Sequence, residues 1–255
     1  MDKNELITLI LSARRARFGN NFYSMDVLDH LEDFWMDGKS FLFSYNDHGI
    51  KRLIYFTEKP EELDRLLKKV IGTYYLEYLT EDSETNCPEA DIVARMKRMS
   101  NADCRSVFIA DSPVLVYQDE TIGQLAETKD AHAINEILWS VFHTEISHLL
   151  TDEELAGKIS EGQFTIHKTE GRIDALLQAD IMPKKFYINQ IVNQTDKKII
   201  HALLLNQLKK YTDQGGKYLY AWVDETNIAS MKFHEKYGMH HDGMWSLIYR
   251  VERVK

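Results

Sequence analysis

The sequence predicts a mixed α/β fold, in which helices pack against a sheet with both parallel and antiparallel strands. Apolar segments with the alternating period of strands are interleaved with segments of helical period along the 255 residues. Two turns, Asn46–Gly49 and Glu170-Gly171, have hairpin chemistry, whereas strands separated by a helix favour parallel pairing. The pattern breaks near Pro113, which predicts a smaller α/β domain over 1–112 and a second domain over 113–255.

Composition limits the classes of protein to consider. A hydrophobic content of 44% is enough to build buried cores. A formal net charge of −9 argues against a general nucleic-acid or anionic-membrane binder, because such proteins need basic surfaces. No segment resembles a signal peptide or approaches the roughly 20 apolar residues that span a bilayer. Cys87 and Cys104 lack redox or zinc spacing, so we expect reduced thiols and a cytoplasmic location without membrane contact.

The first domain is expected to be α/β. Its fourth element, 59–72, has Pro60 and acids early and lysines late, with Leu63, Leu66 and Leu67 on one helical face. Apolar and aromatic residues on both sides of Asn46–Gly49 predict a hairpin. The expected elements in order are a helix over 3–17, a short helix over 30–35, a hairpin over 39–58, a helix over 59–72, a strand over 73–80 and a helix over 88–99.

The second domain repeats this alternation more fully. Thr151 precedes acidic residues and predicts the start of a helix, while Gly215-Gly216 predicts the end of another. In that longer helix, the buried stripe is expected to contain Ile200, Leu204, Leu208 and Tyr211. The expected elements are a strand over 121–128, helices over 130–142 and 151–159, a hairpin over 163–181, a strand over 184–192, a helix over 196–216, a strand over 218–225, a helix over 227–238 and a last strand pair around 242–252.

The segment "YLYAWVDETNIASMKFHEKYGM", residues 218–239, resembles the end of the GNAT superfamily of acyl-CoA N-acyltransferases. The matching positions are a strand followed by Asn227, Ser230, Phe233, His234, Lys236, Gly238 and Met239. The resemblance covers about 117–255. It implies a GNAT-like fold for the second domain, with acetyl-CoA or another acyl-CoA as co-substrate and a small-molecule or peptide amine as acceptor. The first domain is interpreted as a second α/β domain, with a degenerate GNAT-like copy as one alternative.

The resemblance also implies catalytic roles. Members of this family often place a tyrosine at the position of His234, as the general acid that reprotonates the leaving thiolate. Histidine can exchange protons at neutral pH, so His234 is a candidate catalytic residue, with Tyr237 as a substitute. The backbone N–H groups near Ile191 and Val192 would hold the thioester carbonyl and its oxyanion. The alternative for His234 is a helix residue that is packed beside Tyr237 or exposed to water, and Tyr237 points in a different direction, because each residue along a helix turns by about 100°.

Four further residues are candidates for contact with the acceptor. Asn189 and Gln190 are amides in an otherwise apolar strand, and one of them should point into the cleft, because adjacent strand residues face opposite sides. His143 and Glu145 lie between the first two helices, a loop that the resemblance places over the acceptor site. A metal site is not expected, because His143 and His148 are five residues apart, a poor spacing on a helix.

The chain departs from the family pattern where the helix after the fourth strand begins. The family has an Arg or Gln, then Gly, then Gly or Ala, which lets backbone N–H groups wrap the CoA pyrophosphate; here Thr195, Lys198 and Ile200 stand at those positions. Lys197 and Lys198 could grip phosphates instead, or could form an ordinary solvated face. Asn227 could reach the cofactor or simply cap its helix.

Three hypotheses about function follow. The first is N-acyl transfer from acyl-CoA to an amine. The second is an aminoacyl-tRNA-dependent transferase of tandem GNAT type, which fits the missing glycines but not the net charge of −9; nucleic acid is expected as a partner in this alternative only. The third is a GNAT fold kept as a binding or regulatory module. The acceptor, the acyl group and the oligomeric state are not defined by the sequence.

Overall fold

The computed structural model describes residues 3–85, 87 and 90–254. The chain forms two compact units. The first unit comprises Met1–Met96 and Met244–Lys255, and the second comprises Lys97–Gly243. Both boundaries fall inside strands, β6 (Asp91–Asn101) and β12 (His240–Arg253). The first boundary falls at 96/97, whereas the sequence predicts 112/113, and the last strand also contributes to the core of the first unit.

The first unit has a sheet in the order β2-β3-β4-β5-β12, with the short β1 paired to β4. The predicted hairpin forms between β3 and β4, whose turn has positive φ at His48 (51°) and Gly49 (92°). β5 runs parallel to β4 and antiparallel to β12. The strand bounds are β1 Gly19–Asn20, β2 Leu31–Asp37, β3 Ser40–Asp47, β4 Ile50–Thr57 and β5 Gly72–Thr80.

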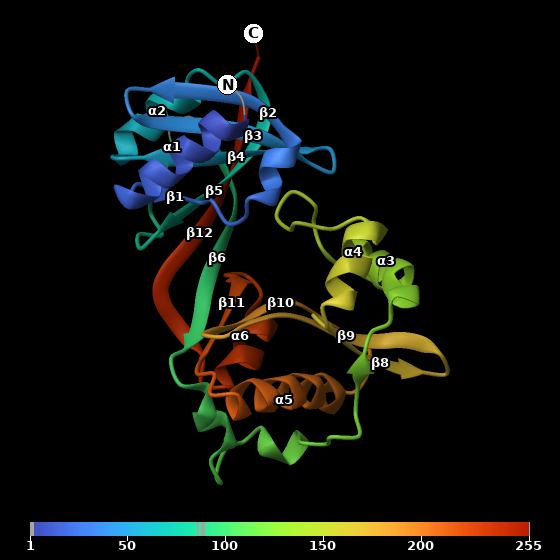
Figure 1. The fold of residues 1–255 in the computed structure, drawn as a ribbon. Helices are drawn as coiled ribbons and strands as arrows, with labels where there is room; N and C mark the ends of the chain where they lie inside the picture. The colour runs from blue at the N-terminus through green and yellow to red at the C-terminus, as the bar shows by residue number, and fades with distance from the viewer. Residues whose placement is uncertain (1–2, 86, 88–89, 255) are drawn as a thin grey trace. The chain divides into compact units, whose positions relative to one another are not determined.

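Two helices cover opposite faces of this sheet (Figure 1). α1 (Lys3–Arg15) buries its apolar side against aromatic residues of β3 and β4. α2 (Pro60–Leu67) buries Leu63, Leu66 and Leu67 against the other face, as the helical spacing predicts. A 3₁₀ helix, η1 (Asp26–His30), precedes β2.

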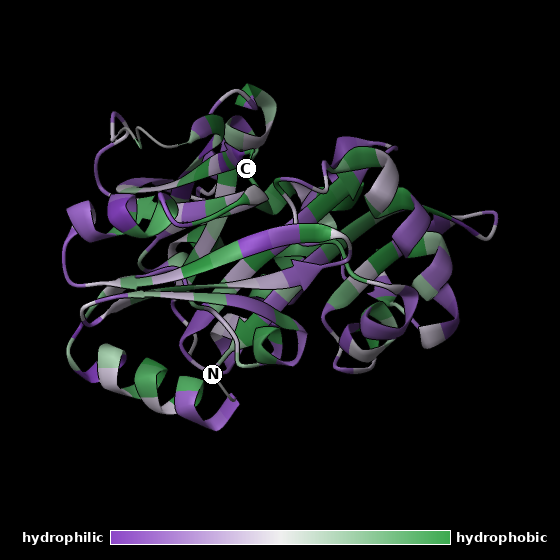
Figure 2. Cartoon of the chain, turned by 90° about the horizontal axis from the view of Figure 1, so that it is seen from above, coloured by the Kyte–Doolittle hydropathy of each residue, from purple (hydrophilic) through white to green (hydrophobic). Residues whose placement is uncertain are grey.

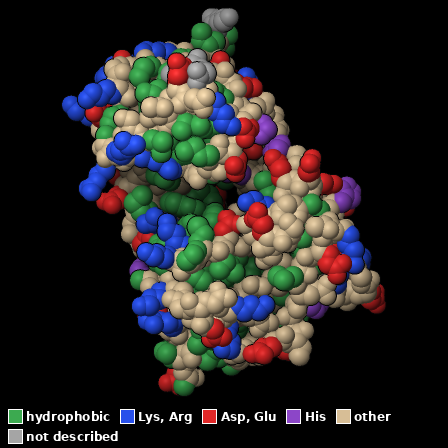
Figure 3. Space-filling view, viewed as in Figure 1, with side chains coloured by type: hydrophobic (Ala, Val, Ile, Leu, Met, Phe, Trp, Pro, Cys, Tyr) green, Lys and Arg blue, Asp and Glu red, His purple; other side chains and the backbone are tan. Residues whose placement is uncertain are grey.

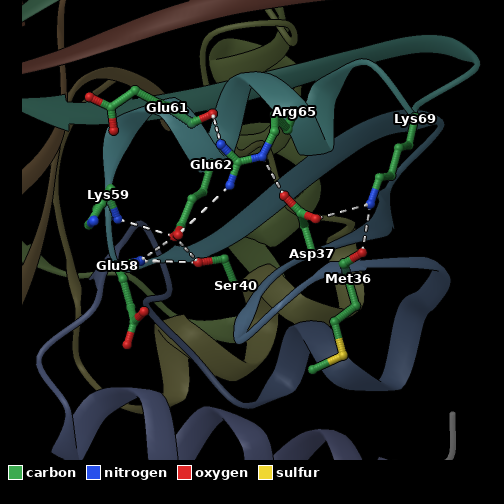
Figure 4. Close-up of polar contacts among 9 residues, drawn as sticks. All are labelled: Met36, Asp37, Ser40, Glu58, Lys59, Glu61, Glu62, Arg65 and Lys69. Atoms are coloured by element: carbon green, nitrogen blue, oxygen red, sulfur yellow. Dashed lines mark hydrogen bonds and ion pairs between the residues drawn. The ribbon is translucent and has the colours of Figure 1, made fainter.

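Figure 4 shows how the N-terminus of α2 is fixed. The Glu62 carboxylate accepts hydrogen bonds from the backbone N–H of Glu58 at 3.2 Å and of Lys59 at 3.3 Å. These N–H groups precede the helix, so the carboxylate satisfies donors that the helix leaves open. Arg65 Nε, one turn later, lies 2.7 Å from Asp37 Oδ2 at the β2–β3 turn. α2 is therefore tied to the sheet by polar contacts as well as by its apolar face.

The second unit has strands in the order β6-β11-β10-β9-β8-β7. β10 pairs parallel with β11 and antiparallel with β9, so the sheet is mixed as predicted. Helices α3 and α4 lie on one face of the sheet, and α5 and α6 lie on the other (Figure 1). The bounds are β7 Gln124–Leu125, β8 Phe164–Thr169, β9 Arg172–Met182, β10 Lys185–Asn193, β11 Tyr218–Asp224, α3 Ala131–Val141, α4 Asp152–Ser160, α5 Lys197–Asp213, α6 Ile228–Glu235, η2 Cys104–Phe108, η3 Leu115–Tyr117 and η4 Thr128–Asp130.

The two faces of the second sheet have separate cores. Along β9, Leu177 packs on the α5 face while Leu176 packs on the face of α3 and α4, as alternation requires. The predicted α5 stripe is confirmed, because its four residues are at most 4% exposed: Ile200, Leu204, Leu208 and Tyr211. Figure 2 shows hydrophobic and hydrophilic residues mixed along the elements, as expected for elements with one buried side.

Three predicted elements are wrong. Residues 91–99 belong to strand β6 rather than to a helix, and Pro88 and Glu89 lie outside the described residues. Residues 30–35 mostly belong to strand β2 instead of a short helix. The strand pair expected around 242–252 is the single long strand β12. In the first two cases pairing with neighbouring strands overrides the local preference of the sequence.

The two cysteines are free and buried. Burial raises the pKa of Cys87 to about 12 and that of Cys104 to about 11, so both stay protonated and unreactive at neutral pH. No helix in the described part of the chain is long and apolar enough to cross a bilayer. The cytoplasmic location remains a prediction.

Candidate active site

β10 and β11 separate midway along their length. Their parallel pairing runs from Lys185 with Tyr218 to Ile188 with Ala221, and ends there. β10 then continues to Asn193 against β9 alone, after a bulge between Ile188 and Gln190. Beyond Ile188, the edges of β10 and β11 that face each other carry no ladder between them. Peptide groups on these edges are therefore positioned to bind something other than a strand.

The register identifies which N–H groups face this opening. Gln194 N–H donates to Asp174 O on the β9 side at 2.8 Å. Backbone groups alternate along a strand, so Val192 pairs with Leu176 of β9 in the same way, while the Ile191 N–H points to the opposite edge. Of the two predicted oxyanion donors, Ile191 has the required direction. The Val192 N–H is directed into the β9 ladder, which corrects its predicted role.

The N-terminus of α5 follows directly after β10. Asp196 caps it, and its Oδ1 accepts from the Lys198 N–H at 2.9 Å. This carboxylate occupies a donor that a phosphate would need, and it repels phosphate by its charge. The Lys197 and Lys198 side chains are exposed, with Lys198 Nζ 3.9 Å from Asp196 Oδ2, whereas Ile200 is packed in the core. The helix dipole and the lysines favour an anion here, and Asp196 opposes it.

His234 lies on α6 and is only 4% exposed. Its Nδ1 is 2.8 Å from the Ser230 carbonyl oxygen, which can only accept, so Nδ1 carries the proton. Its Nε2 is buried and has no partner among the described residues. Burial lowers the pKa of His234, which keeps the ring neutral at pH 7. In this state Nε2 offers a lone pair and no proton, so the geometry does not fit the predicted role of general acid.

Tyr237 is fully buried beside a histidine that the sequence analysis did not single out. Its hydroxyl oxygen is 2.8 Å from Nδ1 of His201 on α5. The His201 ring lies between those of Tyr117 and Phe233, with centroids at 4.5 and 4.8 Å. Burial raises the pKa of Tyr237 above its usual value and, together with Lys236 and Lys197, lowers that of His201 to about 4. Tyr237 is thus a core partner of His201, which disfavours its predicted catalytic role.

The remaining predicted residues lie on three elements. The exposed Asn227 caps α6, with its Oδ1 accepting from the Ser230 N–H at 3.0 Å, which is the structural alternative for this residue. Asn189 is the exposed residue at the β10 bulge, while Gln190 is 7% exposed and lies opposite Gln178 of β9. The exposed residues His143 and Glu145 lie in the turn between α3 and α4.

The comparisons with known proteins agree with this architecture. No family model matches the sequence, and no curated protein matches it. The solved structures that it resembles include a GCN5-related N-acetyltransferase from Sphaerobacter thermophilus, with 12% identity, a TM-score of 0.57 and coverage of 85% of this chain and 78% of the other. A GNAT-family acetyltransferase from Colwellia psychrerythraea has 14% identity, a TM-score of 0.53 and coverage of 86% and 84%.

A tandem GNAT protein from the clavulanic acid biosynthesis pathway covers more of the chain, 96% against 93% of its own length, with 10% identity and a TM-score of 0.55. The chain therefore has the GNAT fold, and the mixed α/β architecture predicted from the sequence is confirmed. At these identities the likeness concerns the fold; activity and substrates require a separate argument.

Proposed function

We propose that this protein is an N-acyltransferase that moves an acyl group from acyl-CoA to an amine. The observation that carries this proposal is the opening between β10 and β11 beyond Ile188, with the Ile191 N–H directed into it. A neutral amine attacks the thioester carbonyl carbon, and the carbonyl oxygen takes up negative charge. A fixed backbone N–H stabilises that charge without reorganising. The amine nitrogen then loses a proton to solvent water, and the carbon–sulfur bond breaks with its electron pair passing to sulfur.

The leaving thiolate does not need an acid from the chain. An ordinary thiol has a pKa of about 8.5, so its thiolate can leave as such and take a proton from water. This matters because neither His234 nor Tyr237 offers a proton in the observed arrangement. Their catalytic roles are therefore not part of the proposal.

The donor is expected to bind mainly through its thioester and pantetheine arm. The α5 N-terminus offers helix N–H groups and two lysines, yet Asp196 and the absence of glycine weaken it as a pyrophosphate site. The tRNA-dependent alternative has less support, because the net charge is −9 and both signs of charge occur over the visible face in Figure 3. The non-catalytic alternative is favoured by Asp196 and by the inward-facing His234.

Isothermal titration calorimetry distinguishes the proposed acyltransferase from the non-catalytic binding module. We expect acetyl-CoA and acetyl-pantetheine, which lacks the nucleotide and its phosphates, to bind with affinities within about tenfold of each other, a difference of about 1.4 kcal/mol. Release of free thiol in the presence of amines would then establish transfer. Absence of heat at millimolar acetyl-CoA and millimolar acetyl-pantetheine would rule out the enzyme and leave the binding module.

A further inference from the structure

The second unit contains a cavity away from the strand opening. Its volume is about 290 Å³, and it is lined by Glu161, Gly162 and Gln163 after α4 and by residues 179–182 at the end of β9. The Ala179 N–H donates to Gln163 O at 2.9 Å, which fixes the lining turn to the strand. Gly162 has a φ of 76°, a conformation that glycine adopts at little cost. The cavity is thus built from a constrained turn and a strand end.

Two polar side-chain atoms of this cavity are acceptors that lack donors among the described residues. Asp180 Oδ1 and Gln163 Oε1 are both buried and have no partner among the described residues. Gln163 Nε2 is 2.8 Å from Glu161 Oε2, which fixes the amide orientation, because a carboxylate can only accept. Lys158, 3.9 Å from Glu161 Oε2, is the neighbouring cation, and it lies outside the lining. Buried acceptors without partners are costly, so this lining suits a ligand that brings a hydrogen-bond donor.

Apolar and aromatic groups surround these acceptors. Ile181 and Met182 line the cavity and are 41% and 42% exposed, more than is usual for such side chains. Tyr187 lies opposite Asp180 in the ladder and stacks on Tyr220 with centroids 4.7 Å apart. Burial, and next the charge of Asp180, raise the pKa of Tyr220, so this carboxylate is close to the tyrosine pair. Aromatic faces and aliphatic rims suit a cation on an alkyl stem.

We propose that this cavity binds a primary alkylammonium group, with the ammonium at Asp180 and Gln163 and its stem against Met182, which lies on the same face of β9 as Asp180. An ammonium group carries three donors, enough for the two unpaired acceptors, Asp180 Oδ1 and Gln163 Oε1. Mg²⁺ or Ca²⁺ fits less well, because each takes six or more oxygen ligands. The role that we assign to this cavity rests on the proposed function. Tyr187 precedes Ile191 by four residues, about 13 Å of strand, so the cavity would hold a second, non-reacting amine of the acceptor.

Calorimetric titration of the full chain without CoA tests the cavity independently of acyl transfer. The probes are 1,5-diaminopentane and Nα-acetyl-lysine methylamide, with 1,5-pentanediol as the neutral match. We expect both amines to bind, the diol not to bind, and Asp180→Asn to weaken amine binding at least tenfold. Glu170→Gln removes an exposed carboxylate on the β8–β9 turn and should leave binding unchanged.

Equal binding of the diol and the diamine to the unmodified protein would overturn the proposal, and so would unchanged amine binding by folded Asp180→Asn. The diol comparison needs no variant, so it holds even if that substitution impairs folding. Tighter binding of the lysine derivative would indicate that the alkylammonium group belongs to a peptide. Tighter binding of the diamine would indicate that it belongs to a small polyamine. Both outcomes support the site. Amine binding in the absence of acyl transfer would support the cavity as a binding site and contradict the proposed enzyme activity.

Discussion

Single residues in the motif that resembles GNAT proteins are engaged with their own neighbours. Asn227 caps α6, His234 donates to the Ser230 carbonyl, and Tyr237 is bonded to His201. The sequence places these residues on the correct elements, but the direction of each side chain depends on partners far away in the chain. His201 is 36 residues from Tyr237. Its only indication in the sequence is a polar residue inside the apolar run 199–205.

The buried pair of His201 and Tyr237 should make stability depend on pH. The pKa of His201 is lowered to about 4 in the folded protein, against about 6.5 when unfolded, so the unfolded chain binds more protons between these values. The contribution of the neutral, buried His201 to the free energy of unfolding is fully present above pH 6.5 and is lost as the pH falls towards 4. We expect the free energy of unfolding to fall by about 1.4 kcal/mol per pH unit in this window from His201 alone. Urea unfolding at several pH values measures it.

The double variant His201→Leu with Tyr237→Phe removes both polar partners together, so no buried polar group is left unpaired. It should show a pH slope smaller by the His201 contribution. The exposed His143, replaced by Asn, should keep the slope of the unmodified protein. If all three proteins show the same slope, His201 does not titrate as described.

At the scale of elements, segments with a long, clear period were the predictable ones. The span of α5 agrees with its apolar stripe, and the β8–β9 hairpin agrees with its Glu170-Gly171 turn. β6 was missed, because its Ala, Arg, Met and Lys residues prefer helices in isolation and become a strand only beside other strands. The bulge at Asn189 cannot be predicted from the sequence, because it depends on pairing with β9. This bulge shifts the register that orients the Ile191 N–H.

The capped start of α5 leads to a prediction about donor affinity. Asp196→Ala removes the cap, which should cost about 1 kcal/mol of stability. It also frees the Lys198 N–H and removes a negative charge from the helix N-terminus, so acetyl-CoA should bind more tightly. Thermal unfolding and isothermal titration of the same samples measure both effects.

A matched cap is available on α4, where Thr151 Oγ1 accepts from the Glu154 N–H at 3.3 Å. Thr151→Ala should lower stability by a similar amount and leave acetyl-CoA binding unchanged. Unchanged or weaker binding by Asp196→Ala would show that the phosphates do not lie at the N-terminus of α5.

At the scale of the whole molecule, the last strand decides the stability of the first unit. Leu247, Tyr249 and Val251 of β12 are at most 1% exposed and lie in the core beneath α2. Burying three such side chains contributes on the order of 5–9 kcal/mol, comparable to the whole stability of an ordinary domain. A chain lacking residues 244–255 should therefore lose the folded first unit, detected by limited proteolysis and by circular dichroism.

A chain shortened only by residues 254 and 255 is the control, because Val254 is 92% exposed and little packing is lost. It should unfold like the full chain. If the longer truncation resists protease as well as this control does, β12 is dispensable for the first unit.

The path of β12 also reverses the order in which the units can be completed during synthesis. Domains generally fold as units, with the N-terminal one first as the chain leaves the ribosome. Here the second unit, 97–243, is fully synthesised while the first still lacks the strand that pairs with β5. The nascent first unit keeps an open apolar edge until β12 has been synthesised. Slow translation of the codons for 97–253 would prolong that exposure, and general chaperones would be recruited to the part of the chain made first.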